Sequence, residues 1–413
     1  MITKHVSPFW ADPASYLPLV YLSLSVPLLA LERNAITGMS DGEVNIAPLL
    51  ASYIILSVAS LSIYRYRSVF RSAFAPGDLF FMLFVTITLV SVFAHGSLNP
   101  LLQSGVLIII AAGFRAASVS SRFFTGLQIA SLCMLAFMVF TVLVFGNPTQ
   151  RWIKGIHPNL FGGVAVATAI LASFGSSRRF EVCAAVSFFC ALYVSSRYAM
   201  VSIFIFYSIY WVLNIKRIGI VRIFFAAAAI YFLAADFLLS QNFGVIGSAL
   251  KLNASDRGLS SGFTGRDQLW ENFSYQFNEQ PLFGYGFRNR AGYSGAHNGF
   301  LNLILENGLL GSVSILGFYI YRFISVAREA LSTPTTEIRG RYLAGMFAVT
   351  FGAMLQPQVL SFGDAFSVTV LLLLLAAPGS ERAGSAHAAE LALTRRTTTS
   401  RSRAIRDNAR YVR

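Results

Sequence analysis

Charged residues are scarce in this sequence. Asp, Glu, Lys and Arg together make up 12% of the 413 residues, against roughly 25% in ordinary soluble domains. Apolar residues make up 55% and aromatic residues 14%. A chain with so few charges cannot cover a soluble surface of normal polarity, so the composition predicts an integral membrane protein.

Acidic residues are the scarcer kind of charge, with 18 Asp and Glu against 32 Lys and Arg. They are scattered, and the sequence contains no DxD pair, HExxH motif or Walker loop. The three cysteines, Cys133, Cys183 and Cys190, all fall in apolar runs and form neither a disulfide pattern nor a zinc spacing. We therefore expect no metal, no other cofactor and no nucleotide-driven chemistry.

What the chain has instead is a series of long apolar runs. Each is close to the roughly 20 residues that a helix needs to cross a bilayer. The sequence predicts an all-α integral membrane protein with about twelve transmembrane helices. These lie near residues 14–31, 46–64, 78–95, 99–114, 123–145, 160–175, 180–195, 198–213, 223–240, 299–320, 342–360 and 365–378.

The basic residues predict the orientation, because Lys and Arg accumulate in cytoplasmic loops. With a cytoplasmic N-terminus, 23 of the 32 basic residues fall in cytoplasmic segments and nine in outer ones. This bias supports the span count and places both termini in the cytoplasm. The nine basic residues in outer segments are exceptions to this bias and require an explanation. They are Arg33, Arg151, Lys154, Arg197, Lys251, Arg257, Arg266, Arg288 and Arg290.

The spans divide the chain into four parts. Residues 1–240 form an N-terminal bundle of about nine spans, 241–297 a large external loop, and 298–378 a C-terminal bundle of about three spans. Residues 379–413 are basic and rich in Thr and Ser, which predicts a disordered cytoplasmic tail near anionic lipid rather than a nucleic-acid-binding segment.

The external loop is too long to be structureless, so we expect elements of its own there. In "TGRDQLWENFSYQF", Leu269, Phe273 and Phe277 recur every four residues, which predicts an amphipathic helix in the membrane interface. The segment "PLFGYGFRNRAGYSGAHN" follows, with Gly284, Gly286, Gly292 and Gly295 around Arg288 and Arg290. Such a stretch lets backbone N–H groups and guanidinium groups approach an anion.

An ordered set of motifs resembles the O-antigen ligase and O-antigen polymerase superfamily, which includes exopolysaccharide polymerases. "GIHPNLFGG" (155–163) is similar to the family's HPN entry to a span, and "VSSRYAM" (194–200) to its SR motif. "SGFTGRDQLW" (261–270) is similar to its GR-x-x-x-W segment. "PLFGYGF" and "AHNGFLNLILENGLLG" resemble its G-x-G and HN…E-x-G-x-x-G signature. The resemblance covers residues 155 to 311.

The resemblance implies a metal-independent glycosyltransferase in the bacterial inner membrane, with its active loop facing the periplasm. The donor would be an oligosaccharide on undecaprenyl diphosphate. The acceptor would be a hydroxyl on a second carrier-linked glycan in a polymerase, or on lipid A core in a ligase. The family's essential basic residues fall on Arg197, Arg266 and His297.

The residue chemistry agrees in kind. A departing lipid diphosphate develops negative charge, which Arg197 and Arg266 would stabilise bidentately, unless Arg197 only snorkels to the interface and Arg266 only starts a helix. A neutral His297 could accept the proton of the acceptor hydroxyl, contact phosphate or sugar, or cap the following helix.

The remaining candidates are assigned to substrate binding: Arg288, Arg290, Asn298, His157, Asn159 and Glu306. Each has a plainer interpretation. Arg288 and Arg290 would be solubilising loop residues, Asn298 a helix cap, His157 and Asn159 part of a turn, and Glu306 a packing residue inside a membrane helix, where an ionisable group is costly.

A polysaccharide or small-molecule exporter is the alternative class, because it would also be basic and polytopic. Transporters place polar residues in broken helices near mid-membrane, whereas here they concentrate in one outer loop and its borders. The sequence therefore favours the glycosyltransferase, as a polymerase ahead of a ligase.

Overall fold

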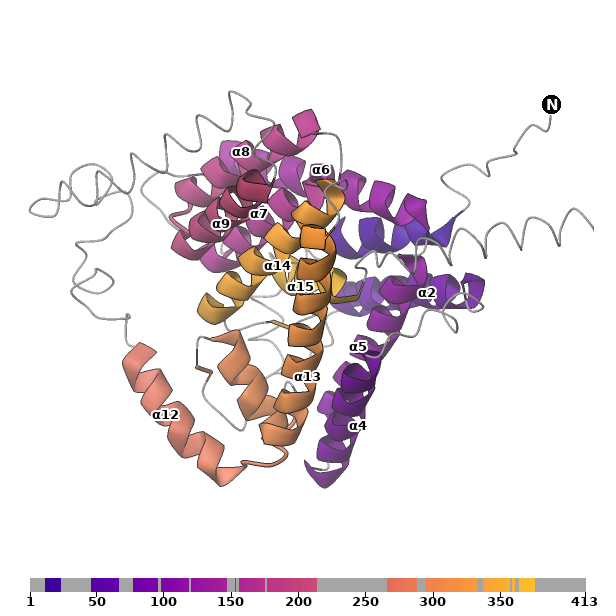
Figure 1. Cartoon of the computed structure of the whole chain (residues 1–413), viewed down its shortest axis with the longest axis vertical. Helices are drawn as coiled ribbons and strands as arrows, with labels where there is room; N and C mark the ends of the chain where they lie inside the picture. The colour runs from indigo at the N-terminus through magenta and orange to yellow at the C-terminus, as the bar shows by residue number, and fades with distance from the viewer. Residues whose placement is uncertain are drawn as a thin grey trace, which may run out of the picture.

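The protein is described here from a computed structural model, and the described part is helical (Figure 1). Within it, β-type pairing is limited to an isolated bridge between Ile153 and Ile156. The described residues are 12–23, 46–66, 77–95, 98–118, 120–146, 153, 156–174, 177–213, 266–287, 295–296, 298–332, 337–356, 359–360 and 364–375.

The helices of the predicted spans begin within a few residues of where the apolar runs begin. Residues 13–23 are helical, and eleven further helices follow in the described ranges. They are α2 (Ile46–Arg65), α4 (Asp78–His95), α5 (Leu98–Ala117), α6 (Ser121–Phe145), α7 (Pro158–Ala172), α8 (Ser177–Tyr193), α9 (Arg197–Leu213), α12 (Arg266–Glu279), α13 (Gly299–Ser332), α14 (Glu337–Leu355) and α15 (Ala365–Leu375). The predicted span 223–240 and the tail 379–413 lie outside the described residues.

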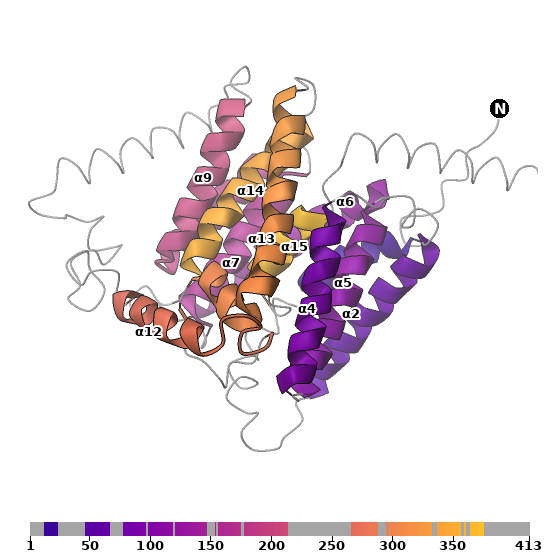
Figure 2. The same ribbon diagram turned by 60° about the horizontal axis from the view of Figure 1, so that its bottom comes forward.

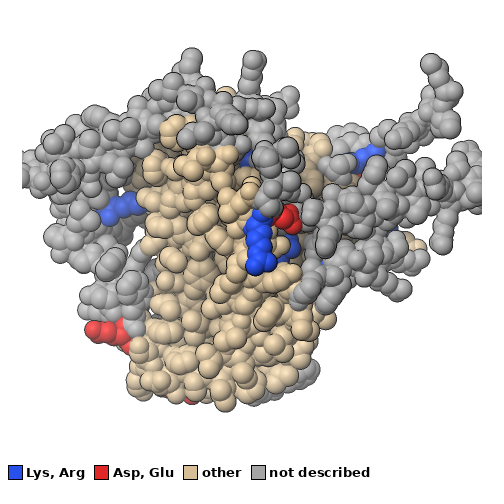
Figure 3. Space-filling view, in the orientation of Figure 1, with Lys and Arg blue, Asp and Glu red and all other residues tan. Residues whose placement is uncertain are grey.

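Length and composition allow two of these helices to cross a membrane by themselves, α6 over Arg122–Phe145 and α13 over Gly299–Leu331. The other apolar helices, such as α7, α9 and α15, are shorter. Large apolar side chains stay exposed along α4, α6 and α13, including Met82, Leu143 and Val313. The face in Figure 3 is mostly free of Lys, Arg, Asp and Glu over the described residues. Exposed apolar surface of this extent suits lipid rather than water.

The centre of the bundle is α7, which contacts α6, α8, α9 and α15. Nearly every α7 side chain is buried, and its glycines allow neighbouring helices to come close. A Cβ on Gly162 would lie 2.2 Å from the Oγ of Ser196, and one on Gly163 would lie 3.2 Å from the hydroxyl of Tyr198. The pair of glycines in "NLFGG" is therefore what lets the start of α9 lie directly against α7.

The remaining helices extend this centre on both sides. The helix α14 packs against α9 and α13, α13 packs against α4, and α2 packs against α5. Figure 2 shows these helices running in roughly one direction, with α12 lying across them at one end. We call this the site end. There α4 and α14 finish and α7, α9, α13 and α15 begin.

Polar side chains fix the opposite end. Asp12 is buried and accepts hydrogen bonds from the hydroxyls of Tyr66 at 2.8 Å and Ser120 at 3.0 Å. Arg115 pairs with Asp78 between α5 and α4. The guanidinium of Arg341 donates to the carbonyl of Ser173 and lies 5.5 Å from the ring centre of Phe180. Each of these groups lies in or near a segment that the charge pattern predicts to be cytoplasmic.

The predicted span 299–320 is wrong in one respect, because α13 is broken. Gly308 has φ 62° and ψ −168°, which no helix residue adopts. The hydroxyl of Ser312 donates to the carbonyl of Leu303 at 3.2 Å, whereas residues nine apart in a straight helix are separated by about 13 Å. The parts 299–307 and 309–332 therefore fold back on each other, as Figure 1 shows.

Candidate functional site

The break in α13 is held by residues 281–286, which we call the strap. The N–H groups of Tyr285 and Gly286 donate to the carbonyls of Leu305 at 2.8 Å and Glu306 at 2.9 Å. In return, the carbonyls of Pro281 and Leu282 accept from the N–H groups of residues 309 and 310, at 2.8 and 3.3 Å. The strap thus pairs groups that both helix ends would otherwise leave without partners.

Glycine is required where the strap meets the break. Gly284 has φ +67° and Gly308 φ +62°, in the left-handed half of the map. A Cβ on Gly284 would lie 2.4 Å from the carbonyl oxygen of Leu305, and one on Gly308 would lie 2.3 Å from the carbonyl of Leu282. The glycines of "PLFGYG" and "ENG" therefore serve one close backbone contact.

This geometry corrects one sequence-based expectation. The glycine-rich stretch that contains Gly284 and Gly286 is expected to let backbone N–H groups approach an anion. Instead, Gly284 N–H donates to the carbonyl of Gln280 at 3.1 Å, and the next two N–H groups bind the end of the first part of α13. Only Gly292 and Gly295 of the predicted cradle lie beyond the strap, and Gly292 lies outside the described residues.

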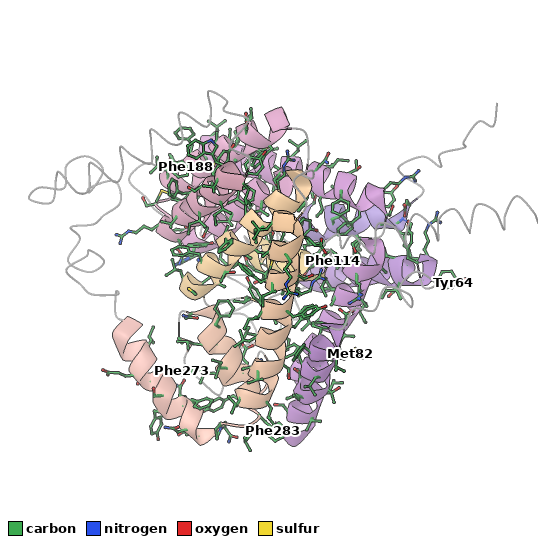
Figure 4. The ribbon with its side chains drawn as sticks, viewed as in Figure 1. Tyr64, Met82, Phe114, Phe188, Phe273 and Phe283 are labelled. Carbon is green, nitrogen blue, oxygen red and sulfur yellow. The ribbon has the colours of Figure 1, made fainter. Side chains whose placement is uncertain are left out.

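Side chains tie the strap to α4. The hydroxyl of Ser91 donates to the carbonyl of Phe283 at 3.1 Å. Asn307, fully buried beside the break, donates to the carbonyl of Leu303 at 3.0 Å and lies 3.3 Å from the hydroxyl of Thr88. Figure 4 shows Phe283 at this end of the molecule.

The predicted amphipathic helix exists as α12, and the strap holds its C-terminal end. The hydroxyl of Tyr285 donates to the carboxylate of Glu279 at 2.5 Å and lies 3.1 Å from the carbonyl oxygen of Gln276. Partial burial and the Glu279 carboxylate raise the pKa of Tyr285 to about 12. Phe273 and Phe277 stack with ring centres 6.0 Å apart, as their spacing predicts (Figure 4). Arg266 is the first residue of this helix.

The start of α13 is fixed by two asparagines. The Oδ1 atom of Asn298 accepts hydrogen bonds from the N–H groups of Phe300 at 3.0 Å and Leu301 at 3.2 Å, so the helix-cap interpretation of this residue is confirmed. The Oδ1 atom of Asn302, which is 4% exposed, accepts from the N–H group of Ala296 at 2.7 Å. His297 lies outside the described residues, but both of its neighbours in the chain are held.

A second cluster forms where α7, α9 and α15 begin. The Nδ1 atom of His157 accepts from the N–H group of Asn159 at 3.1 Å and caps α7. The hydroxyl of Tyr198 donates to the carbonyl of Asn159 at 2.6 Å. Asp364 caps α15 and accepts from the N–H group of Ser367 at 3.1 Å. A Cβ on Gly163 would lie 3.2 Å from both the Tyr198 hydroxyl and Asp364 Oδ1, so these two groups are close neighbours.

The end of α14 connects the two clusters. Phe366 packs on Gly352, where a Cβ would lie 2.6 Å from its ring, and its own ring centre is 6.3 Å from that of Tyr198. One turn later, a Cβ on Gly299 would lie 2.9 Å from the carbonyl oxygen of Gln356. Segments that are far apart in the sequence, the HPN, SR and HN motifs, therefore meet at the site end.

The predicted site residues fall into four groups. His157, Asn159, Asn298 and the half-buried Arg197 lie at helix starts at the site end. Glu306, which is 5% exposed, lies beside the break of α13. Arg266 lies at the start of α12, and Arg288, Arg290 and His297 lie outside the described residues.

The sequence analysis did not predict two polar residues that lie at the site end. One is Asp364, whose signal was an acidic residue directly before the apolar run of a predicted span. The other is Gln356, which is 7% exposed and has an amide Nε2 without a hydrogen-bond partner. A buried donor in that state requires an explanation. Within the described ranges, no group of three His, Cys, Asp or Glu side chains could hold a metal ion.

Comparison with known proteins gives one finding. Residues 182–316 match a family model described as O-antigen ligase. The match spans the SR, GR-x-x-x-W, G-x-G and HN motifs and confirms the resemblance to the O-antigen ligase and polymerase superfamily. It supports a role as a polysaccharide polymerase or O-antigen ligase, the kind of enzyme that acts on lipid-linked oligosaccharides and glycan acceptors. Proteins of this family are integral to the inner membrane. No curated protein matches the chain.

Proposed function

Starting from this likeness to O-antigen ligases, we propose that the chain transfers an oligosaccharide from undecaprenyl diphosphate to an acceptor hydroxyl. The reaction takes place on the periplasmic face of the inner membrane, and the product is a longer exopolysaccharide or O-antigen chain. The observation that carries the proposal is the meeting of the HPN, SR and HN motifs at one end of the bundle, through Tyr198, Phe366 and Gly299.

In the proposed reaction, the bond between the anomeric carbon and the diphosphate oxygen breaks while the acceptor oxygen bonds to that carbon. Arg197 and Arg266 stabilise the negative charge that develops on the departing diphosphate, because guanidinium groups stay charged and bind its oxygens in pairs. His297 takes the proton of the acceptor hydroxyl. No step requires a metal, since lipid diphosphate is already a good leaving group.

Substrate binding is assigned to the groups around these three. Arg288 and Arg290 bind diphosphate or glycan from the loop that precedes α13. His157 and Asn159 form one wall of the site beside Arg197, and Asn298 and Glu306 belong to the first part of α13 on the other side. Asn298 would bind substrate in addition to capping its helix through its side-chain oxygen.

A ligase that transfers the glycan to lipid A core would use the same residues, because only the acceptor differs. Reconstitution separates the two enzymes. With carrier-linked repeat units as the only substrate, a polymerase yields a ladder of longer glycans. A ligase yields product only when lipid A core is added.

The exporter gains no support from the broken helix. In transporters, the freed backbone groups of discontinuous helices coordinate the cargo. Here the strap binds the carbonyls of Leu305 and Glu306 and the N–H groups of residues 309 and 310. These four backbone groups are therefore hydrogen-bonded within the protein.

The residue roles are tested in proteoliposomes with carrier-linked oligosaccharide and acceptor. Arg266→Lys keeps the charge but loses the planar fork, so turnover should fall by more than about tenfold with the protein still inserted. The wild-type rate should rise with pH through an apparent pKa near that of histidine, about 6.5 before environmental shifts.

His297→Gln decides between a base and a binding residue, because an amide can bind phosphate or sugar but cannot take up a proton. Loss of turnover with donor affinity intact supports the base. Near wild-type activity of the Gln variant would refute it. A wild-type protein that makes no glycan from either acceptor, and instead moves glycan across vesicles, would replace the enzyme with the exporter.

A further inference from the structure

The first part of α13, residues 299–307, is a short helix that is fixed at both ends. At its C-terminal end the strap binds the carbonyls of Leu305 and Glu306. At its N-terminal end Gly299 packs against the end of α14, where Val359 and the carbonyl of Gln356 leave no room for a Cβ. Because this helix is fixed, the position of the chain that enters it depends on how the residues just before Gly299 are held.

Asn302 holds those residues. It lies one turn into the helix, and its Oδ1 atom turns back towards the entering chain and accepts from the N–H group of Ala296 at 2.7 Å. Its amide group also lies 3.7 Å from where a Cβ of Gly295 would be. Both Asn302 and Ala296 are buried, with relative exposures of 4% and 0%.

The ordinary role of asparagine does not explain this position. Inside a helix asparagine is unfavourable because its side chain competes for backbone groups, and it is therefore found mainly at caps and turns. The cap of this helix is already provided by Asn298, whose Oδ1 atom accepts from residues 300 and 301. The buried amide of Asn302 instead secures the peptide between Gly295 and Ala296, the residue directly before His297.

We propose that Asn302 is a positioning residue for His297. Its side-chain oxygen holds the N–H group of Ala296, and Asn298 holds the start of α13, so both chain neighbours of His297 are fixed at the site end. This inference rests on the proposed function, in which His297 takes a proton from the acceptor. A base must be placed within hydrogen-bond reach of that proton, and a misplacement of about 1 Å costs roughly 100-fold in rate.

The variants that test this separate the hydrogen bond from packing. Asn302→Leu has a similar shape and removes the acceptor. Asn302→Asp has the same shape and keeps an acceptor oxygen. Asn307→Ala is the matched control, because Asn307 is also a fully buried asparagine of the same short helix but lies at its other end and binds Leu303 and Thr88.

The measurements are kcat and the KM for the donor as a function of pH, together with the melting temperature in detergent. We expect Asn302→Leu to lower kcat by about 10- to 100-fold with little change in KM. Asn302→Asp should recover most of kcat and move the apparent pKa of the pH profile upwards, since a carboxylate favours the charged imidazole. Asn307→Ala should lower the melting temperature and leave kcat near that of the wild type.

The inference fails if Asn302→Leu keeps the wild-type kcat, or if Asn302→Asp is as slow as Asn302→Leu. It also fails if Asn307→Ala lowers kcat as much as Asn302→Leu, because the effect would then be general to the short helix. Failure of the proposed function is a different result, in which the wild-type protein makes no glycan or His297→Ala keeps full activity.

Discussion

Replacing Gly308 with alanine should open the strap without unfolding the bundle. The backbone of Gly308, at φ 62° and ψ −168°, lies in a region that only glycine adopts readily, and a side chain there costs about 1–3 kcal/mol. The new Cβ would also lie 2.3 Å from the carbonyl carbon and oxygen of Leu282, which are backbone atoms and cannot rotate away. The strap must therefore move.

Hydrogen exchange of the strap measures this effect. The N–H groups of Tyr285, Gly286 and Leu309 are bonded across the break in the wild type. If the cost of the substitution destabilises the closed strap by about 1.4–2.8 kcal/mol, these amides should exchange about 10- to 100-fold faster. Amides in α7 and α9 should be unchanged.

Gly105→Ala is the matched control, because nothing lies within 4 Å of a Cβ at this helical position in α5. There alanine should be neutral or stabilise by roughly 0.5–1 kcal/mol. Equal exchange rates in Gly308→Ala and the wild type would refute the strap. Faster exchange over the whole bundle would mean that the break and the fold cannot be separated.

Two further predictions concern the whole chain. Because Lys and Arg alternate between loops, single cysteines at Ser248 and Ser385 should be labelled from opposite sides of the membrane, and labelling from one side would overturn the predicted topology. Because the sequence has no DxD motif or other metal-binding pattern, transfer should continue in excess chelator, and a loss of activity that Mg²⁺ or Mn²⁺ restores would refute the metal-independent reaction.

Hydropathy predicted the helices well because it measures what the bilayer selects. The run 78–95 coincides with α4, and 46–64 with α2, since in each case turn or charged residues border an apolar stretch. The break at Gly308 was missed because apolar stretches lie on both sides of the polar pair Glu306-Asn307. A sum of hydropathies over such a run does not record a change in the direction of the chain. The available signal was the pair Asn307-Gly308 inside an apolar run.

The sequence predicted candidate residues for the site but not the contacts between them. Alternating spans place the starts of α7 and α9 at the same end, so the proximity of Asn159 and Arg197 could be anticipated. That Tyr198 binds Asn159, and that Asp364 lies beside Tyr198, depends on how closely Gly162 and Gly163 let the helices pack. Such distances follow from tertiary packing, which no local pattern contains.

The strap and the break depend on each other for their backbone hydrogen bonds. This limits where two similar proteins can be joined in a chimera. Residues 281–286 and 305–310 exchange four backbone hydrogen bonds and need glycine on both sides. A chimera that takes its external loop from one protein and its following helix from another divides this unit if the junction falls between residues 286 and 305. Junctions before residue 276 and after residue 312 would transfer the unit whole, together with the Tyr285 contact to α12 and the Ser312 contact to Leu303.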